Sequence, residues 1–370
     1  MKQILKLRRL WLLLTFPAAF LLTALAAGNE GFAEGYANTV YPVLSHFGNR
    51  LTGMTLSFSF GEFFVYALLL FFAAALVRFL ARLIREKENR ALTAGKFFVN
   101  LLCAAGVLFF LFTGNCGINY YRTPFAQTCG LKVKASSKEE LAKLCTVLAK
   151  SSNDLRAEVK TNPQTVMQLD SRQFSANSEK ARSAFDRLSG TYPLLRSGYS
   201  GPKPVLASKM MSRCNITGMF FPFTFEANVN TDVPEYTIPF TMCHELSHLR
   251  GYMREDEANF IAYLACSQST DMDFRYSGSV MAFTYASNAL FSADGDTAGS
   301  IFSTLSEGVR RDLQFNNDYW NSFKGPAADA ANSVNNSYLK ANNQQDGVQS
   351  YGRMVDLLLA LQRAGKLAKD

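Results

Sequence analysis

Histidine is scarce in this sequence, with only three among 370 residues, at positions 46, 244 and 248. Two of the three stand four residues apart, so a pair of imidazoles at helical spacing occurs once. No histidine follows His248, and a metal site in this stretch must therefore take a further ligand of another type. The sequence also lacks internal repeats, a phosphate-binding glycine loop and a dinucleotide fingerprint, which argues against a repeat protein and against nucleotide binding through those motifs.

Net charge is small outside the N-terminal region. The whole chain carries +8, and residues 1–96 contribute eleven Lys and Arg against five Asp and Glu, or +6, which leaves +2 for the remainder. A nucleic-acid-binding domain concentrates its basic residues on the surface that meets the phosphates. The distribution here therefore assigns the excess charge to the N-terminal region and argues against nucleic acid as a partner.

Three long apolar runs occupy the first 114 residues, at about 10–27, 60–80 and 96–113. They approach the ~20 residues that a helix needs to cross a bilayer. The second and third runs contain stretches that are apolar on all sides, Phe71–Val77 and Val107–Phe112, which favours lipid over a soluble core. We expect residues 1–114 to form a membrane region of three transmembrane helices, with the lipid bilayer as its partner.

Basic residues indicate the orientation of these helices. They gather before the first run, at 2–9, and between the second and third, at 78–96, whereas residues 28–62 contain only Arg50. Because cytoplasmic loops collect Lys and Arg, we expect the N-terminus inside and the domain at 115–370 outside the cytoplasm. The first run could instead be a signal peptide cleaved near Ala26. We favour an uncleaved anchor, because two more apolar runs follow.

The candidate site lies in the stretch His-Glu-Leu-Ser-His that starts at His244. On a helix, His244 and His248 project from one face about a turn apart, as two ligands of one metal must. Such a pair is typical of a zinc ion, Zn²⁺. Glu245 lies about 100° around the helix, where its carboxylate can act as a general base on water beside the metal without binding the metal.

A carboxylate should complete the ligand set, because catalytic zinc keeps three protein ligands and one open position. Glu255, Asp256 and Glu257 stand together after a short turn at Gly251. We prefer Glu255, because Asn259 follows one turn later on the same face and can hold a ligand in place by a hydrogen bond.

Two other residues are weaker candidates for the metal. Cys243 adjoins His244, but its helix position points it away from the histidine face. His46 is expected to be an ordinary loop or interface residue. Six of the seven cysteines lie in the outward domain, where disulfides persist, and proximity makes Cys116 with Cys129 our first choice of pair.

The domain is expected to be mainly α with a small β edge hairpin, an α+β fold. Gly218–Thr224 and Glu235–Phe240 are predicted as strands, and a proline in each places them at an edge. Such an edge could pair with an extended substrate, or could simply pack on the metal helix. A capping-box pattern at Ser137 opens a helix to about Lys150. Further helices are expected at 177–188, 279–290, 299–314, 327–340 and 348–364.

Most of the chain resembles the bacterial membrane proteins of domain-of-unknown-function family 3810, a zincin-like group. The resemblance rests on Phe220–Asn230, Ile238–His248 and Arg254–Phe260, and continues in Asn119–Arg122, Tyr338–Lys340 and Gly347–Leu357. It implies a multi-pass protein of the bacterial cell membrane whose outer domain is a zincin-like metallopeptidase domain.

The spacing from Glu255 to Asn259 also looks like the Glu-x-x-x-Asp element of gluzincins, which include the prenyl-protein endopeptidase and the metalloprotease domain of β-lactam sensors. That likeness implies Glu255 as the third ligand. Here Asn259 replaces the usual Asp, and the gap from His248 to Glu255 is shorter than in those relatives.

These features lead to two hypotheses. The first is a membrane-anchored zinc metallopeptidase that cuts peptides or proteins at the cell envelope, with zinc on His244, His248 and Glu255 and with Glu245 as general base. The oxyanion would still need a donor, for which Tyr263, Tyr276 and Arg310 are candidates. The alternative is a catalytically inactive zincin-like binding or sensory module, and a carboxylate of 255–257 that meets the histidines would distinguish the two.

Overall fold

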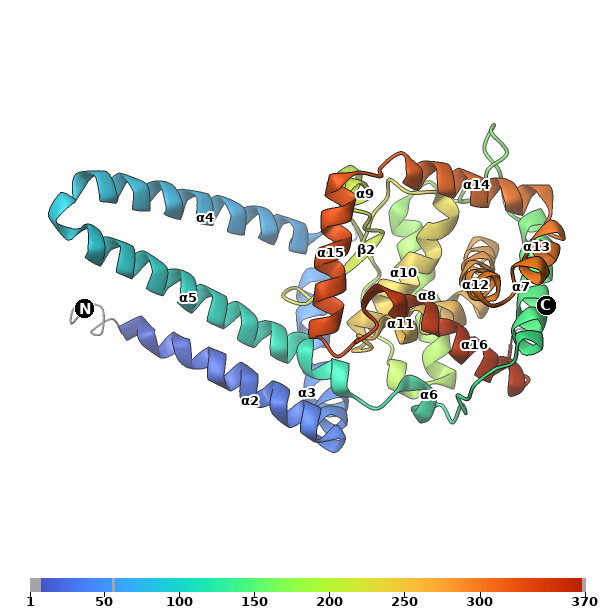
Figure 1. The fold of residues 1–370 in the computed structure, drawn as a ribbon, viewed down its shortest axis with the longest axis horizontal. Helices are drawn as coiled ribbons and strands as arrows, with labels where there is room; N and C mark the ends of the chain where they lie inside the picture. Colours follow the sequence, from blue (N-terminus) through green and yellow to red (C-terminus); the bar gives the residue numbers. More distant parts are fainter. Residues whose placement is uncertain (1–7, 55–56, 368–370) are drawn as a thin grey trace.

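Three long apolar helices project from one side of a mainly helical domain (Figure 1). The structure is a computed structural model, and it describes residues 8–54 and 57–367. The first of the three consists of η1 (Arg8–Leu14) and α2 (Thr15–Gly28); the others are α4 (Phe60–Arg85) and α5 (Arg90–Asn115), joined by η2 (Lys87–Asn89).

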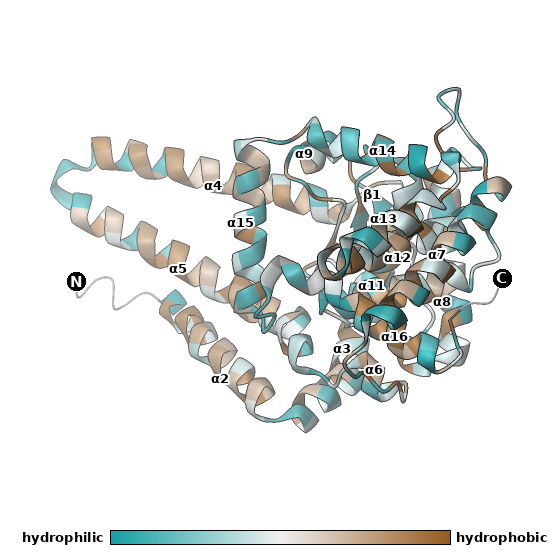
Figure 2. Cartoon of the chain, turned by 45° about the vertical axis from the view of Figure 1, so that its right-hand side comes forward, coloured by the Kyte–Doolittle hydropathy of each residue, from teal (hydrophilic) through white to brown (hydrophobic). Residues whose placement is uncertain are grey.

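All three helices are long and apolar enough to cross a membrane, as the sequence predicted. Their ribbons carry hydrophobic residues along most of their length, and the turn between α4 and α5 is hydrophilic (Figure 2). The α2 helix packs along α5, where Gly106 allows close approach: a Cβ at this position would lie 2.6 Å from Thr15 Oγ1. The α4 helix meets α5 near the turn, with the rings of Phe79 and Phe97 stacked 4.1 Å apart. Toward the domain, α4 and α5 diverge (Figure 1).

A fourth N-terminal helix, α3 (Glu30–Thr52), packs on the domain. The Asn29 side chain caps it by accepting from Phe32 N–H. The fully buried hydroxyl of Tyr41 donates to the carbonyls of His248 and Leu249, at 3.2 and 3.1 Å. The boundary at 114/115 stays a prediction, but the contacts of α3 show that a helix from before it contributes to the domain's structure.

The centre of the domain is formed by α10 (Ile238–Leu249), α11 (Glu255–Ser267) and α12 (Met272–Ala293), and α7 (Lys138–Glu158) covers α12. The capping box predicted at Ser137 is confirmed: its hydroxyl accepts from Glu140 N–H, and the Glu140 carboxylate accepts from Ser137 N–H. The remaining helices are η3 (Gly117–Tyr121), α6 (Phe125–Thr128), α8 (Phe174–Thr191), η4 (Pro193–Leu195), α9 (Ser208–Arg213), η5 (Glu235–Thr237), α13 (Gly295–Ser303), α14 (Glu307–Asn321), α15 (Pro326–Ala341), η6 (Gly347–Arg353) and α16 (Met354–Arg363).

A three-stranded sheet lies beside α10 in the order β1-β3-β2. Its strands are β1 (Lys203–Pro204), β2 (Gly218–Phe221) and β3 (Glu226–Val229), with β3 parallel to β1 and antiparallel to β2. The first predicted strand is confirmed in part as β2, but the second, Glu235–Phe240, is wrong. That segment forms η5 and the first turn of α10, where the missing N–H of Pro239 leaves no helical hydrogen bond unmade.

Two further expectations need correction. The helix expected at 299–314 is interrupted, because Ser306 caps a new helix by accepting from Val309 N–H. The disulfide expected between Cys116 and Cys129 is wrong, because both cysteines are free. Cys116 Sγ instead lies 3.6 Å from Met253 Sδ, so η3 and α6 lead the two cysteines to different neighbours.

Candidate metal centre

A tight turn brings the start of α11 back against α10. Gly251 adopts φ +86°, a conformation that favours glycine. Its N–H donates to the carbonyl of His248 at 2.9 Å, and Tyr252 N–H donates to that of Ser247 at 3.2 Å, which closes the end of α10. A Cβ at Gly251 would also lie 3.0 Å from the ring of Tyr41. The turn therefore needs glycine for both its conformation and its packing.

The three residues that the sequence predicted as ligands lie together at this turn. The Nε2 atoms of His244 and His248 are 3.0 Å apart, and Glu255 Oε2 lies 3.1 Å from the first and 3.6 Å from the second. Each residue offers one ligand atom, and these atoms all lie within 4.8 Å of one another. This cluster could hold a metal ion.

The other nitrogen of each imidazole fixes which atoms face the centre. His244 Nδ1 lies 2.7 Å from Asn259 Oδ1, and His248 Nδ1 lies 2.8 Å from the carbonyl oxygen of Tyr252. Both partners are acceptors, so both Nδ1 atoms carry the hydrogen and a neutral imidazole presents a lone pair at Nε2. Two nitrogen lone pairs and a carboxylate oxygen then converge, an arrangement that only a positive charge between them can satisfy.

The electrostatics of the cluster agree with this geometry. Burial opposes the charged form of His248, but the facing Glu255 carboxylate raises the pKa of His248 to about 9. Burial likewise opposes ionisation of Glu255, and the two histidines nevertheless lower the pKa of its carboxyl to about 2. The site thus holds one positive charge beside a carboxylate. A proton supplies this charge when no metal is bound, and a metal cation can replace the proton.

Glu245 lies beside the cluster, with only 4% of its surface exposed. Its Oε2 has no hydrogen-bond partner within residues 8–54 and 57–367. Strand β2 passes directly over it: a Cβ added to Gly218 would lie 2.5 Å from Glu245 Oε1. Burial raises the pKa of Glu245. A carboxyl in these surroundings is suited to take up and return a proton.

The neighbouring carboxylates do not join the cluster. Glu257 pairs with Arg254 at 3.0 Å and accepts from Phe125 N–H at 2.6 Å. Burial raises the pKa of Asp256 to about 6, and this carboxyl lies outside the group of three that could hold a metal among the described residues. The preference for Glu255 over these two therefore agrees with the geometry.

The two weaker metal candidates also lie apart from the cluster. Cys243 is fully buried and forms a side-chain hydrogen bond with Cys266 of α11, away from the histidine face. His46 packs α3 against the domain, with Nδ1 2.8 Å from the carbonyl oxygen of Pro42 and Nε2 3.1 Å from that of Ser197. It is an interface residue, as expected.

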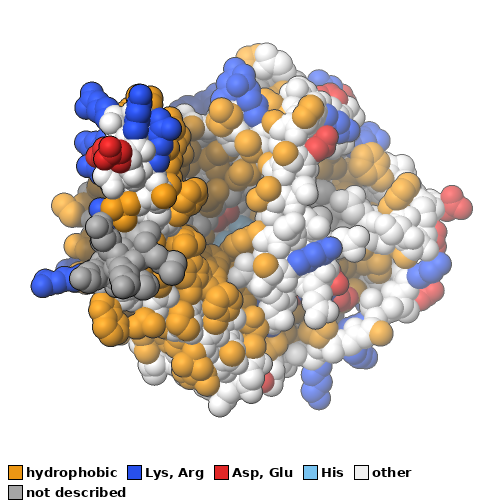
Figure 3. Space-filling model, turned by 60° about the vertical axis from the view of Figure 1, so that its left-hand side comes forward, with side chains coloured by type: hydrophobic (Ala, Val, Ile, Leu, Met, Phe, Trp, Pro, Cys, Tyr) orange, Lys and Arg blue, Asp and Glu red, His pale blue; other side chains and the backbone are white. Residues whose placement is uncertain are grey.

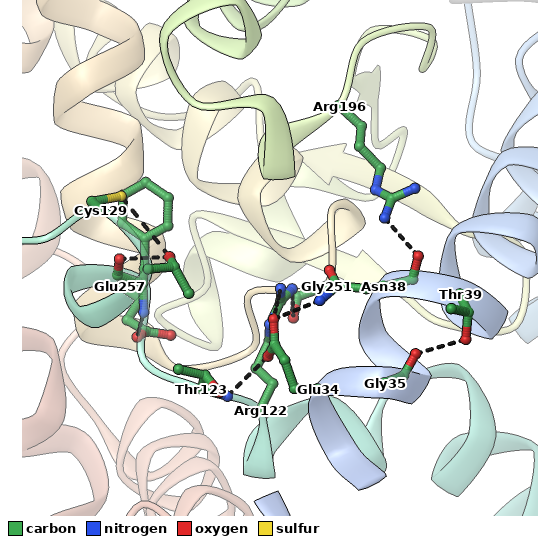
Figure 4. A network of polar contacts seen from close by, with 12 residues as sticks. Glu34, Gly35, Asn38, Thr39, Arg122, Thr123, Cys129, Arg196, Gly251 and Glu257 are labelled. Carbon is green, nitrogen blue, oxygen red and sulfur yellow. Dashed lines mark hydrogen bonds and ion pairs between the residues drawn. The ribbon is translucent and has the colours of Figure 1, made fainter. Parts of the chain in front are cut away.

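Helix α3 holds the ligand turn from the other side (Figure 4). Glu34 accepts from Thr123 N–H at 3.0 Å and pairs with Arg122 at 3.4 Å. Arg122 in turn donates to the carbonyl of Gly251 at 3.4 Å, and Arg196 donates to that of Asn38 at 2.7 Å. The turn between His248 and Glu255 is thus fixed by a helix that lies far earlier in the sequence. Tyr41 of α3, for example, donates to the carbonyl of His248, 207 residues later.

Sequence reasoning missed several residues around the cluster. Gln344 Oε1 accepts from the backbone N–H of Glu255 at 3.0 Å, and so fixes the first residue of α11. Tyr285 of α12 forms a side-chain hydrogen bond with Asn259 and is close enough for Glu255 to affect its pKa, which burial raises to about 12. Of the expected oxyanion donors, Tyr276 instead donates to Asp312 at 2.5 Å. No local pattern marks Tyr285 or Gln344, because each reaches the site from a distant part of the chain.

Comparison with known proteins gives a family and no named relative. No curated protein and no solved structure matches the chain. The model of one family, described as "Protein of unknown function (DUF3810)", matches residues 36–359. This range runs from α3 to α16 and contains both the ligand turn and two of the three apolar helices. The chain therefore belongs to the DUF3810 family, as its motifs predicted.

Proposed function

We propose that this protein is a membrane-anchored zinc metallopeptidase that hydrolyses peptide bonds at the cell envelope. One observation carries the proposal: two imidazole lone pairs and a carboxylate oxygen converge beside a second buried carboxylate, Glu245, whose Oε2 has no hydrogen-bond partner in the described chain. The contact of Glu255 with both histidines supports this function over a binding module, because it supplies the three-ligand set of a catalytic site.

The donor set favours zinc among common metals. Two imidazole nitrogens and one carboxylate oxygen suit zinc, whereas calcium and magnesium take oxygen ligands. Asn259 and the Tyr252 carbonyl hold the two imidazoles with Nε2 toward the centre, as second partners of ligand histidines do. When bound, zinc supplies Lewis-acid chemistry, polarising a carbonyl and making water more acidic near neutral pH.

The remaining chemistry falls to residues of the chain. Glu245 takes the proton of the attacking water and returns it to the leaving amine, and its burial keeps its pKa above that of an exposed glutamate. Strand β2 lies at the edge of the sheet, directly over this carboxylate. The side of β2 that does not face β3 can pair with an extended peptide, so that the backbone of the substrate is presented to Glu245 and the metal.

The membrane placement follows from charge. The turn between α4 and α5 carries the basic residues Arg82, Arg85, Lys87 and Arg90, and the end of the pair nearest the domain lacks such a cluster. Cytoplasmic turns collect Lys and Arg, so we place this turn in the cytoplasm and the metal centre on the outer side.

The test uses the full chain in detergent or liposomes, with zinc content and hydrolysis of a quenched fluorescent peptide library measured together. Glu245→Gln should keep about one zinc per chain and should lower the hydrolysis rate by about 10²–10⁴-fold. Glu307→Gln changes an exposed glutamate of α14 and should alter neither.

Metal binding is tested separately with the histidines. His248→Ala should lose both zinc and hydrolysis, and His46→Ala, which removes the one histidine outside the cluster, should lose neither. Zinc that remains in His248→Ala, or hydrolysis that survives in Glu245→Gln, would contradict the proposed roles.

A further inference from the structure

A recess in the surface opens beside the membrane helices. Figure 3 looks onto the molecule from the side of these helices and shows a hollow between them and α15. Histidine and acidic side chains appear at its bottom, and hydrophobic side chains cover much of its walls. The route to the ionisable groups in this view runs past apolar surface that continues along the membrane helices (Figure 2).

Strand β2 connects Glu245 with the start of α4. At one end of the strand Gly218 contacts Glu245, and at the other end the ring of Phe221 lies 5.9 Å from that of Phe64 in the second turn of α4. The strand is four residues long, which corresponds to about 10 Å between its first and last residues. A peptide paired along β2 would therefore run from Glu245 to the first turns of a membrane helix.

The ligand turn is equally close to the end of α5. Cys116, directly after α5, contacts Met253 between His248 and Glu255, with the two sulfur atoms 3.6 Å apart. Asn115 at the last position of α5 donates to the carbonyl of Pro222 in the β2–β3 turn at 3.0 Å. The end of α5 thus contacts the ligand turn and the β2–β3 turn, and the start of α4 contacts the strand that passes over Glu245.

Exposed apolar side chains occur on α4 and on α15. On α4 the side chains of Leu69 and Leu70 are 62% and 72% exposed. Across the recess, α15 places Tyr338 against Phe112 of α5, and Val334, one turn earlier on the same face, is 70% exposed. A substrate dissolved in water would meet the groups of α4 only through the bilayer that this helix is apolar enough to cross, whereas a transmembrane helix could contact them from within the bilayer.

We propose that the site takes its substrate from the bilayer: a membrane-anchored polypeptide whose transmembrane helix lies against α4 and α5 and whose adjoining extended segment pairs with β2. This inference rests on the proposed peptidase function and adds the substrate class. The length of β2 implies that the cut falls within about three residues of the membrane boundary of the substrate. The apolar recess, continuous with the membrane surface of α4, is what distinguishes this substrate from a free peptide.

The experiment measures cross-linking in liposomes that contain the full chain with Glu245→Gln, which prevents turnover. A photoreactive group is introduced by Val334→p-benzoylphenylalanine, in the recess wall, or by Phe302→p-benzoylphenylalanine on α13, which is 43% exposed and away from the membrane helices. The probe is a fluorescent domain joined by a flexible polar linker to an apolar helix of about 20 residues. Its matched form replaces the helix by a polar segment of equal length, and a third form carries a palmitoyl chain instead.

The helix-anchored probe should label position 334 at least about tenfold more than position 302, because anchoring raises its concentration only where the bilayer leads into the site. The polar probe should show no such preference. Equal labelling of the two positions by the anchored probe would overturn the inference, and equal preference by the palmitoylated probe would overturn its assignment to a transmembrane polypeptide.

A second measurement separates this inference from the proposed function. The zinc-loaded protein with native Glu245 is incubated with the anchored and polar probes, whose linkers carry a randomised sequence. Faster cleavage of the anchored form supports both ideas, and equal cleavage of both forms overturns the bilayer route while hydrolysis itself stands. Labelling at position 334 without cleavage of either probe supports the bilayer route and counts against the peptidase.

Discussion

Glu226 and Glu255 are both buried carboxylates with cationic or ionisable partners, yet their surroundings differ. Glu226 of β3 accepts from the backbone N–H groups of Phe60 and Gly61, at 3.1 and 2.6 Å, and its second oxygen also accepts from Thr224 at 2.6 Å. The buried ammonium of Lys203 completes the cluster at 2.5 Å. Every oxygen of Glu226 is paired with donors.

Glu255 faces groups that are acceptors when the histidines are neutral. Its Oε2 has no hydrogen-bond partner in the described chain apart from the ion pairs with the two imidazoles. A buried polar group is normally satisfied, and an exception needs an explanation. The contrast indicates that the Glu226 cluster is complete and structural, fixing the start of α4 to the sheet, whereas the Glu255 cluster has room for a cation and could hold a metal ion.

The largest expected effect concerns the complete cluster. Lys203→Met should lower the free energy of unfolding by about 3–5 kcal/mol, because it leaves the Glu226 carboxylate buried without its cation. Denaturant unfolding of the purified full chain, followed by tryptophan fluorescence, measures the change. Lys150→Met, which breaks the exposed pair with Asp154, is the matched control and should cost no more than about 1 kcal/mol. Equal costs for the two variants would contradict the structural role of Lys203.

A medium effect sharpens the difference between the two clusters. Zinc at one hundred times its dissociation constant should stabilise the wild-type chain by about 2.7 kcal/mol. We expect the same increment in Lys203→Met, because that cluster needs no metal, and no increment in His248→Ala. Thermal unfolding with and without zinc, and again after chelation, provides the readout. Stabilisation that survives in His248→Ala would place the metal elsewhere.

The smallest effect concerns the partner of a ligand. Asn259→Ala should weaken zinc affinity by about 10–100-fold, since His244 loses the acceptor that orients its ring. Competition with a fluorescent chelator measures the affinity of the full chain. Asn321→Ala, at the exposed end of α14, should leave the affinity unchanged. If both variants bind zinc like the wild type, the hydrogen bond to Asn259 does not orient the ligand.

Local patterns predicted much of this molecule. The three apolar helices, the capping box at Ser137, the face shared by His244 and His248, and the face shared by Glu255 and Asn259 all follow from spacing within a few residues, which sequence displays directly. Glu255 was preferred over Glu257 because Asn259 follows it by one helical turn, and the structure places Glu255 against both histidines. The two histidines lie on α10, and Glu255 and Asn259 lie on α11. The turn between the helices was indicated by Gly251, which follows the second histidine.

The rest depends on contacts between distant segments. Tyr41 and Gln344 reach the ligand turn from separations of 207 and 89 residues, and neither carries a local signal. The strand expected at Glu235–Phe240 failed because Pro239 fits the first turn of a helix as well as a sheet edge. The predicted disulfide between Cys116 and Cys129 is wrong because η3 and α6 lie between the two cysteines, and closeness in sequence does not bring their side chains together.

The position of α3 has a consequence for how the protein is made. This helix is synthesised before α4 and α5, yet its Tyr41 and Glu34 fix the ligand turn that follows them. In the proposed orientation, α3 and the domain after residue 115 lie on the outer side of the membrane. The helical hairpin of α4 and α5 must therefore enter the bilayer before the domain can reach α3. In that orientation, the three residues that could hold a metal would come together only after the hairpin has inserted, and a chain with a misplaced hairpin would not assemble them.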